Sequence, residues 1–230
     1  MSVTLSLSSK ITLSAKQEGD AFVQAPAINS YFALTNGSGE GQGNAMWHKE
    51  LTVANDSTQT LDLTSLPVNA LNLSDTLYFW KIRTFYVHNT STTASVEIFA
   101  ADAENNPWDA LYTVPVTLGP GGTLLAMDRV GWLVGGTSKT IKLINAVTAE
   151  SFVGDTVADS RVIGGISDTS ALEVGMIVVG TGVPAGAKIT SKTASTVTLS
   201  VVATAAGTDT EFDAAHPDPV LVVSLAGVLD

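Results

Sequence analysis

The chain has 230 residues, of which 45% are hydrophobic and 14% are charged. This balance supplies enough apolar surface for a substantial core and excludes a disordered chain. The net charge of -11 at pH 7 repels nucleic-acid phosphates and anionic lipids, so we expect no nucleic-acid and no membrane partner. The absence of cysteine excludes disulfides, thiolate metal sites and a cysteine nucleophile.

Short runs of alternating apolar and polar residues fill the first hundred residues, and they predict strands with one wet face. The predicted strands cover residues 3–13, 28–34, 46–53, 60–63 and 77–88. Residues 36–44 are glycine-rich and predict a loop, and Pro67 limits residues 68–71 to one helical turn. Residues 94–100 are expected to return from 77–88 as a hairpin across the Asn89-Thr90-Ser91 turn.

Further strands are predicted at 113–118, 123–127, 132–134 and 140–144, with a strong turn signal at Gly119-Pro120-Gly121-Gly122. Turn signals recur about every 8–12 residues through this region, which is typical of an antiparallel sandwich or jelly roll. We find no amphipathic stretch of helical period longer than about two turns.

The composition changes near residue 158, because no Trp or Tyr occurs between 158 and 212. Glycines punctuate short predicted strands at 161–166, 176–179, 187–191 and 196–201. Residues 220–225 are too apolar for a free tail and are expected to return to the first domain as a core strand. The predicted fold is therefore all-β: an antiparallel, jelly-roll-like β-sandwich (1–157 and 214–230) with a small inserted β module (158–213).

Two passages resemble proteins of bacteriophage particles. The run TLGPGGTLLAMDRVGWLVGGTSKTIKLIN, residues 117–145, is similar to a group of small virion proteins, in a resemblance that spans about residues 31–145 and the last strand. The run VGMIVVGTGVPAGAKI, within residues 162–199, is similar to a module found in phage tail, fibre and decoration proteins. Neither passage carries a catalytic signature.

The resemblance implies a non-enzymatic structural component of a phage particle, such as a capsid decoration, head-fibre or tail-associated subunit, with the module exposed. It also implies a homo-oligomer, of which a trimer is one form, in contact with other virion proteins. Residues 1–16 lack the basic start and continuous apolar run of a signal peptide, so we expect synthesis in the host cytoplasm and assembly into the virion. The alternative hypothesis is a carbohydrate-binding or adhesin module on a virion or cell surface, with glycans as partners.

Sequence motifs for catalysis are missing. His48, His88 and His216 are not spaced as a helical zinc pair, and neither HExxH nor G-x-S-x-G occurs. We therefore expect no enzyme activity and no cofactor.

A polar loop at residues 101–109 holds the one weak metal candidate. Asp102, Glu104 and Asp109 offer oxygen ligands of the kind that Ca²⁺ prefers, although calcium loops show a tighter Asp/Asn-x-Asp rhythm. A solvated loop with Trp108 in the core explains the same residues.

Three tryptophans are candidates for an interface or a binding surface: Trp47, Trp108 and Trp132. Each lies in or beside an apolar run, so core anchoring is the first interpretation and a subunit interface is the second.

Overall fold

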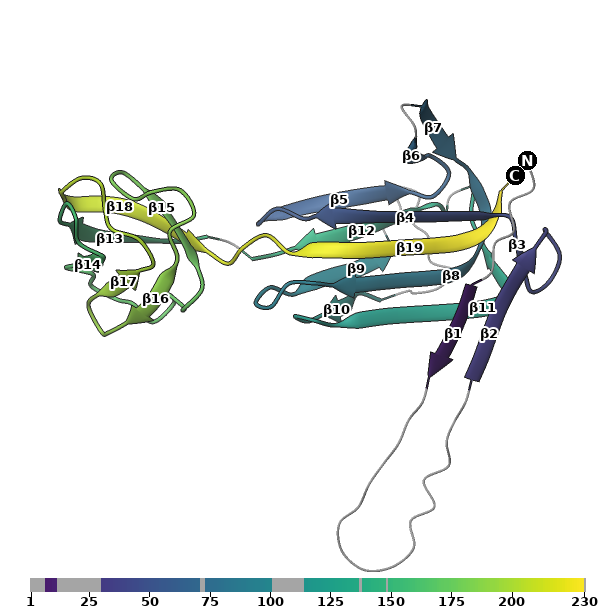
Figure 1. Ribbon diagram of the computed structural model, residues 1–230, viewed down its shortest axis with the longest axis horizontal. Helices are drawn as coiled ribbons and strands as arrows, with labels where there is room; N and C mark the ends of the chain where they lie inside the picture. The colour runs from purple at the N-terminus through teal and green to yellow at the C-terminus, as the bar shows by residue number, and fades with distance from the viewer. Residues whose placement is uncertain are drawn as a thin grey trace, which may run out of the picture.

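The computed structural model describes residues 7–11, 30–70, 73–100, 114–136, 138–147 and 149–229. These residues form strands, turns and loops and contain no helix, so the predicted all-β class is confirmed. No helix suited in length and hydropathy to cross a membrane occurs among them. Figure 1 shows two bodies joined by two adjacent linkers, a sandwich and a smaller barrel.

The sandwich consists of two four-stranded antiparallel sheets. The first sheet has the order β11-β8-β19-β4 and the second has the order β10-β9-β12-β5. The strands of the first sheet are β4 (Ala45–Thr52), β8 (Phe79–Asn89), β11 (Thr123–Leu133) and β19 (Val220–Leu229). Those of the second sheet are β5 (Ser57–Asp62), β9 (Val96–Ala100), β10 (Val116–Leu118) and β12 (Thr140–Asn145).

The core of the sandwich lies between these sheets. Inward-pointing side chains from both sheets fill it, and Phe85, Leu143 and Val223 are almost fully buried there. The strand β19 lies between β8 and β4, so the expected return of residues 220–225 to the core is confirmed.

The predicted hairpin between residues 77–88 and 94–100 is wrong. The strand β9 pairs with β10 and β12 in the second sheet, whereas β8 belongs to the first. Asn89 is fully buried at the crossing, where its Nδ2 donates to the carbonyl oxygens of Ala94 (2.8 Å) and Leu118 (3.1 Å). The hydrogen bonds of this side chain therefore stabilise a connection that crosses from the first sheet to the second, in place of a hairpin within one sheet.

The smaller body is a six-stranded antiparallel sheet in the order β15-β18-β13-β14-β17-β16. Its two end segments also meet: Gly175 N donates to Ile189 O at 2.8 Å, and Val178 N donates to Ala187 O at 2.8 Å. These bonds close the sheet into a barrel with its own core, in which Phe152 stacks on Phe212 at 5.4 Å between ring centroids. The strands are β13 (Glu150–Thr156), β14 (Val162–Gly164), β15 (Ile177–Gly180), β16 (Ile189–Lys192), β17 (Val197–Leu199) and β18 (Gly207–Ala215).

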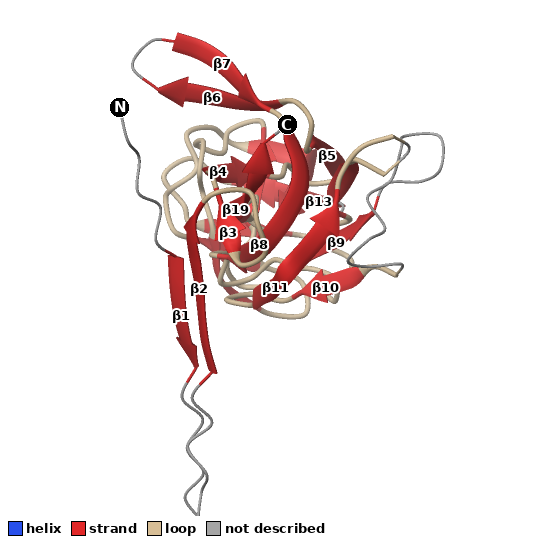
Figure 2. Cartoon of the chain, turned by 90° about the vertical axis from the view of Figure 1, so that its right-hand side faces the viewer, coloured by secondary structure: helices blue, strands red, loops and turns tan. Residues whose placement is uncertain are grey.

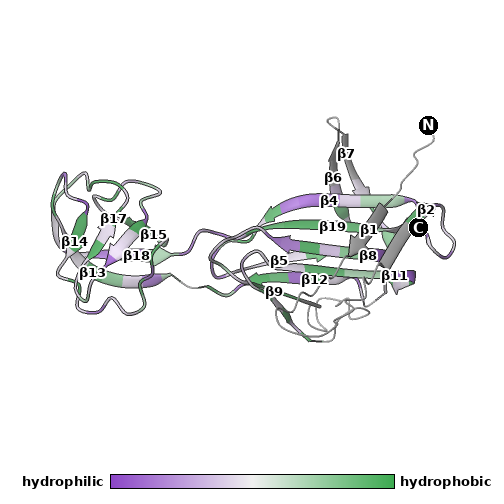
Figure 3. Cartoon of the chain, turned by 60° about the horizontal axis from the view of Figure 1, so that its bottom comes forward, coloured by the Kyte–Doolittle hydropathy of each residue, from purple (hydrophilic) through white to green (hydrophobic). Residues whose placement is uncertain are grey.

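The barrel begins earlier and ends later than the predicted module of 158–213. The strand β13 pairs with β18 from Glu150 onward, in a register that places Phe152 opposite Phe212. The change in composition at residue 158 therefore does not mark the start of the barrel. The first strand of the barrel, β13, still contains the aromatic Phe152, and it ends before residue 158. Figure 3 shows apolar residues along the strands of both bodies.

Shorter pairings extend from the end of the sandwich that is far from the barrel (Figures 1 and 2). The strand β1 pairs with β2 in one of them, β2 pairs in parallel with β3, and β6 pairs with β7 in another. The helical turn predicted at 68–71 is wrong, since residues up to 70 belong to β6 and pair with β7. The bounds are β1 (Leu7–Ile11), β2 (Ser30–Asn36), β3 (Gln42–Gly43), β6 (Leu66–Ala70) and β7 (Leu73–Leu77).

Candidate functional site

The three tryptophan candidates lie in different places. Trp47 is 4% exposed, and its Nε1 donates to the carbonyl oxygen of Pro67 at 3.1 Å, so it lies in the core, as the first interpretation holds. Trp132 is half-buried against the sandwich core on the edge strand β11, and its role in an interface stays a prediction. Trp108 lies outside the described residues, as do the metal candidates Asp102, Glu104 and Asp109.

Two of the three histidines have hydroxyl partners on the first sheet of the sandwich. His48 Nδ1 lies 2.8 Å from Ser224 Oγ, and His88 Nδ1 lies 2.9 Å from Thr123 Oγ1. The strand β19 separates them, so they do not form a pair. Within the described part of the chain, no three His, Cys, Asp or Glu residues gather in a way that could hold a metal ion.

The third histidine, His216, lies at the junction between the sandwich and the barrel. The barrel is reached through residues 146–149 and left through residues 216–219, and a pair of asparagines holds both linkers to the sandwich. Asn145 Nδ2 donates to Asn55 Oδ1 at 2.9 Å, and the buried Asn145 Oδ1 accepts from Val147 N at 3.2 Å. Asn55 Nδ2 in turn donates to the carbonyl oxygen of His216 at 2.9 Å.

The second linker is fastened on both sides. Toward the sandwich, Asp218 Oδ1 accepts from Asn55 N at 3.0 Å, and Pro219 O accepts from Val53 N at 3.1 Å. Toward the barrel, His216 Nε2 lies 3.1 Å from Glu173 Oε2. The imidazole is 12% exposed and its carboxylate partner 65%, so this contact is only partly shielded from solvent.

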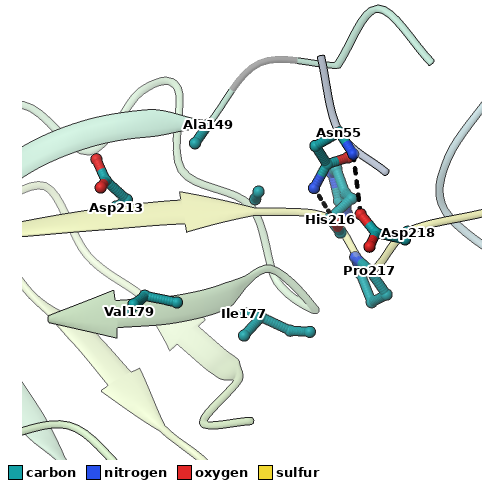
Figure 4. Close-up of a pocket in the computed structure, with 9 residues that line it drawn as sticks. Asn55, Ala149, Ile177, Val179, Asp213, His216, Pro217 and Asp218 are labelled. Carbon is teal, nitrogen blue, oxygen red and sulfur yellow. Dashed lines mark hydrogen bonds between the residues drawn. The ribbon is translucent and has the colours of Figure 1, made fainter. Parts of the chain in front are cut away.

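A pocket of about 200 Å³ opens at this junction (Figure 4). Its apolar wall comes from both linkers and from strands of the barrel, and two carboxylates, Asp213 and Asp218, also line it. The complete lining is Asn55, Ala149, Ile177, Val179, Asp213, Ala215, His216, Pro217 and Asp218.

Each of the two pocket carboxylates accepts a hydrogen bond through one of its two oxygens. Asp213 Oδ1 accepts from Ser151 Oγ at 2.5 Å, and Asp218 Oδ1 is held by the backbone of Asn55. Their Oδ2 atoms have no hydrogen-bond donor or cation among the described residues. No lysine or arginine lines the pocket, so its surface is apolar and acidic.

The contacts of the pocket residues bear on what the pocket can do chemically. A nucleophile held by a base, or two carboxylates placed for acid and base roles, would need a defined mutual contact. The only histidine here contacts Glu173, and neither carboxylate contacts it among the described residues. The arrangement suits binding, because it joins apolar walls to a few fixed acceptors.

The sequence carries little local signal for the junction. The run from His216 to Pro219 directly precedes the strand predicted at 220–225. The paired prolines were the available signal, since two prolines in four residues exclude regular strand pairing. Their partners Asn55 and Asn145 lie far away in the sequence and carry no local signature.

No protein-family model, curated protein or solved structure that was compared with the chain gave a match.

Proposed function

We propose that the chain is a non-enzymatic structural subunit of a bacteriophage particle, with the sandwich as its assembly domain and the barrel projecting outward. The observation that carries the proposal is the strand order of the sandwich. Counted along the chain, the eight strands stand as first, eighth, third and sixth in one sheet, and as second, seventh, fourth and fifth in the other. This order supports a jelly-roll connectivity, which recurs in viral capsid and lectin domains.

The position of the barrel supports the same function. Its linkers enter and leave side by side, because β13 pairs with β18, so the barrel extends from one end of the sandwich (Figure 1). The β1–β2 and β6–β7 pairs lie at the opposite end. A subunit of this shape can use one end for contacts within a particle and present the other to solvent.

The sequence resemblance in residues 117–145 and 162–199 supports a phage particle over other assemblies. The described residues place the first run on β10, β11 and β12 of the sandwich and the second on β14 to β17 of the barrel. Each resemblance therefore falls within one body.

The oligomeric state of the purified full chain tests the proposal. We expect size-exclusion chromatography with light scattering to give one closed oligomer at micromolar concentration. Antibodies raised against the chain should then label intact phage particles in electron micrographs. A strict monomer that binds glycans on an array would contradict the structural role and favour the adhesin alternative, and turnover of a polysaccharide would contradict both.

A further inference from the structure

We propose that the junction pocket binds an organic cation on an aliphatic stem, meaning a primary ammonium group carried by a chain of methylene groups. The pocket, the fixed carboxylates and the missing counter-charge each point to this ligand. The site does not depend on the proposed function, because its chemistry is the same whichever assembly the chain belongs to.

The pocket has the shape and the wall for an aliphatic stem. Ile177 and Val179 of β15 line one side, and Pro217 of the linker closes the end beside them (Figure 4). Val179 is 64% exposed, so a methylene chain laid against it removes apolar surface from water. Lysine stems commonly cover apolar surface in this way.

The charged groups of the wall are carboxylates, which accept hydrogen bonds, and each receives only one hydrogen bond from the described residues. Asp213 and Asp218 come from the barrel and from the linker, and their first oxygens are already occupied by Ser151 and Asn55. Those bonds fix the two carboxylates before a ligand arrives, which lowers the entropy lost on binding. The second oxygens remain as acceptors for a charged donor.

His216 lines the pocket without offering a polar side-chain atom that a ligand can reach. Its Nε2 already faces Glu173 Oε2 at 3.1 Å, and its Nδ1 is buried. The acceptors open to a charged ligand are therefore the second oxygens of Asp213 and Asp218, and an ammonium group complements them.

Two sources could supply such a cation: a lysine side chain of a neighbouring protein, or a free aliphatic diamine. Both present an ammonium group on methylene carbons, so the pocket chemistry is shared. The probes below separate them.

The test is a titration of the ¹⁵N-labelled full chain with n-butylammonium chloride, in which binding is measured from the changes in amide chemical shifts. We expect saturable shifts at Val179, Asp213 and Asp218, and binding about tenfold weaker for n-butanol, which has the same stem without the charge. Blocked lysine that binds as well as butylammonium indicates a protein source. A 1,4-diaminobutane affinity at least about tenfold higher indicates a free diamine.

Asp213→Asn and Asp218→Asn should each weaken butylammonium binding at least about fivefold, while keeping an oxygen for the Ser151 or Asn55 bond. Asp168→Asn is the matched control, since this carboxylate accepts from Ser170 N within the barrel and does not line the pocket. Val179→Lys should supply an ammonium group from the chain itself and block the probe. Equal binding of n-butanol, unchanged affinity in both pocket variants, or shifts that never saturate would each overturn the proposal.

Discussion

The guanidinium of Arg83 donates from Nη2 to the carbonyl oxygen of Gly39 at 2.7 Å. Arg83 is 2% exposed, and its Nη1 donates to the carbonyl oxygen of Arg129, so one buried cation joins the 36–44 loop to the bulge of β11. Gly131 lies in that bulge at φ +83°, where a Cβ atom would come within 2.8 Å of Ile82 O. Two irregular segments, the 36–44 loop and the bulge of β11, are thus fitted around one strand, β8.

Replacement of Arg83 should loosen the loop more than it lowers global stability. Arg83→Met removes the donors to the loop carbonyls, yet it also removes the cost of a buried charge, so the two effects on unfolding partly cancel. We expect amide exchange at Gly41 and Gln42 to rise at least about tenfold. Arg129→Met is the control, because that side chain is 73% exposed and contacts Glu40 at 3.7 Å. Equal exchange in the two variants would contradict the role of Arg83.

The buried amide of Asn89 should be among the most important polar groups of the sandwich. Its Nδ2 also donates to Gly119 O at 3.1 Å, and its Oδ1 accepts from Ser91 N at 3.0 Å. Asn89→Ala leaves these buried groups without partners and should cost about 3 kcal/mol in urea unfolding. Asn44→Ala removes one exposed bond, to Leu229 N, and should cost less than about 1 kcal/mol. A similar loss of unfolding free energy in the two variants would show that burial of the hydrogen-bonded groups does not determine the cost of removing them.

Loss of the asparagine contact at the junction should free the barrel without unfolding it. Asn55→Ala removes the bonds to Asn145 and to His216 O, while the cores of both bodies keep their contacts. We expect ¹⁵N relaxation to show faster, more independent tumbling of the barrel, and both melting temperatures to stay within about 2 °C. Ser57→Ala, which removes a nearby bond to Ala54 O, should leave the tumbling unchanged. Tumbling as one rigid unit in Asn55→Ala would contradict this prediction.

Acid should reduce the contribution of Asp62 to stability. Burial acts to raise the pKa of this carboxyl, but hydrogen bonds from Thr64 and the nearby Lys139 ammonium outweigh it and lower the pKa. A lowered folded pKa stabilises the protein above the unfolded pKa, near 3.9, and this contribution is lost as the pH falls through the folded pKa.

The measurement is urea unfolding of the native chain and of Asp62→Asn at pH 7 and at pH 3. We expect a difference below about 1 kcal/mol at pH 7, because the carboxylate is partly exposed, and a smaller one at pH 3. A difference that grows on acidification would show that the pKa is raised instead.

Deletion of the barrel at its structural limits should leave the sandwich folded. The strands β13 and β18 are paired from Glu150 and Ala214, so a short glycine linker can replace residues 150–215. Deletion of residues 158–212 instead keeps Phe152 but removes Phe212, which leaves an unpaired strand and an exposed ring. We expect a soluble protein with cooperative unfolding from the first deletion and aggregation from the second. Non-cooperative unfolding after the first would show that the barrel is part of the sandwich core.

Much of the fold could be predicted from local patterns. The alternation in residues 46–53 and the apolar run at 220–225 correctly indicated β4 and β19, because burial on one face imposes a period of two. The glycine-punctuated strands of the barrel were also found, within a few residues of β14 to β17.

The errors arose where distant residues decide the structure. The local sequence at Asn89 is typical of a hairpin turn. The buried amide of Asn89 instead binds carbonyl groups up to thirty positions away, and these bonds direct the chain to the other sheet. Nothing in the sequence around Arg83 indicates a buried arginine, since its acceptors are backbone oxygens of remote loops. The pocket shares this property, because Asn55, Ile177 and Asp213 meet only after both bodies have folded.

The placement of β19 has a consequence for biosynthesis. This strand occupies the middle of the first sheet, between β8 and β4, yet it follows the whole barrel along the chain. On the ribosome, β4 and β8 are made without the strand that joins them, whereas the barrel has all six of its strands before β19 is translated. Since domains fold as units during synthesis, the inserted barrel can fold first, and the first sheet of the sandwich closes only after the ten residues of β19 have been made.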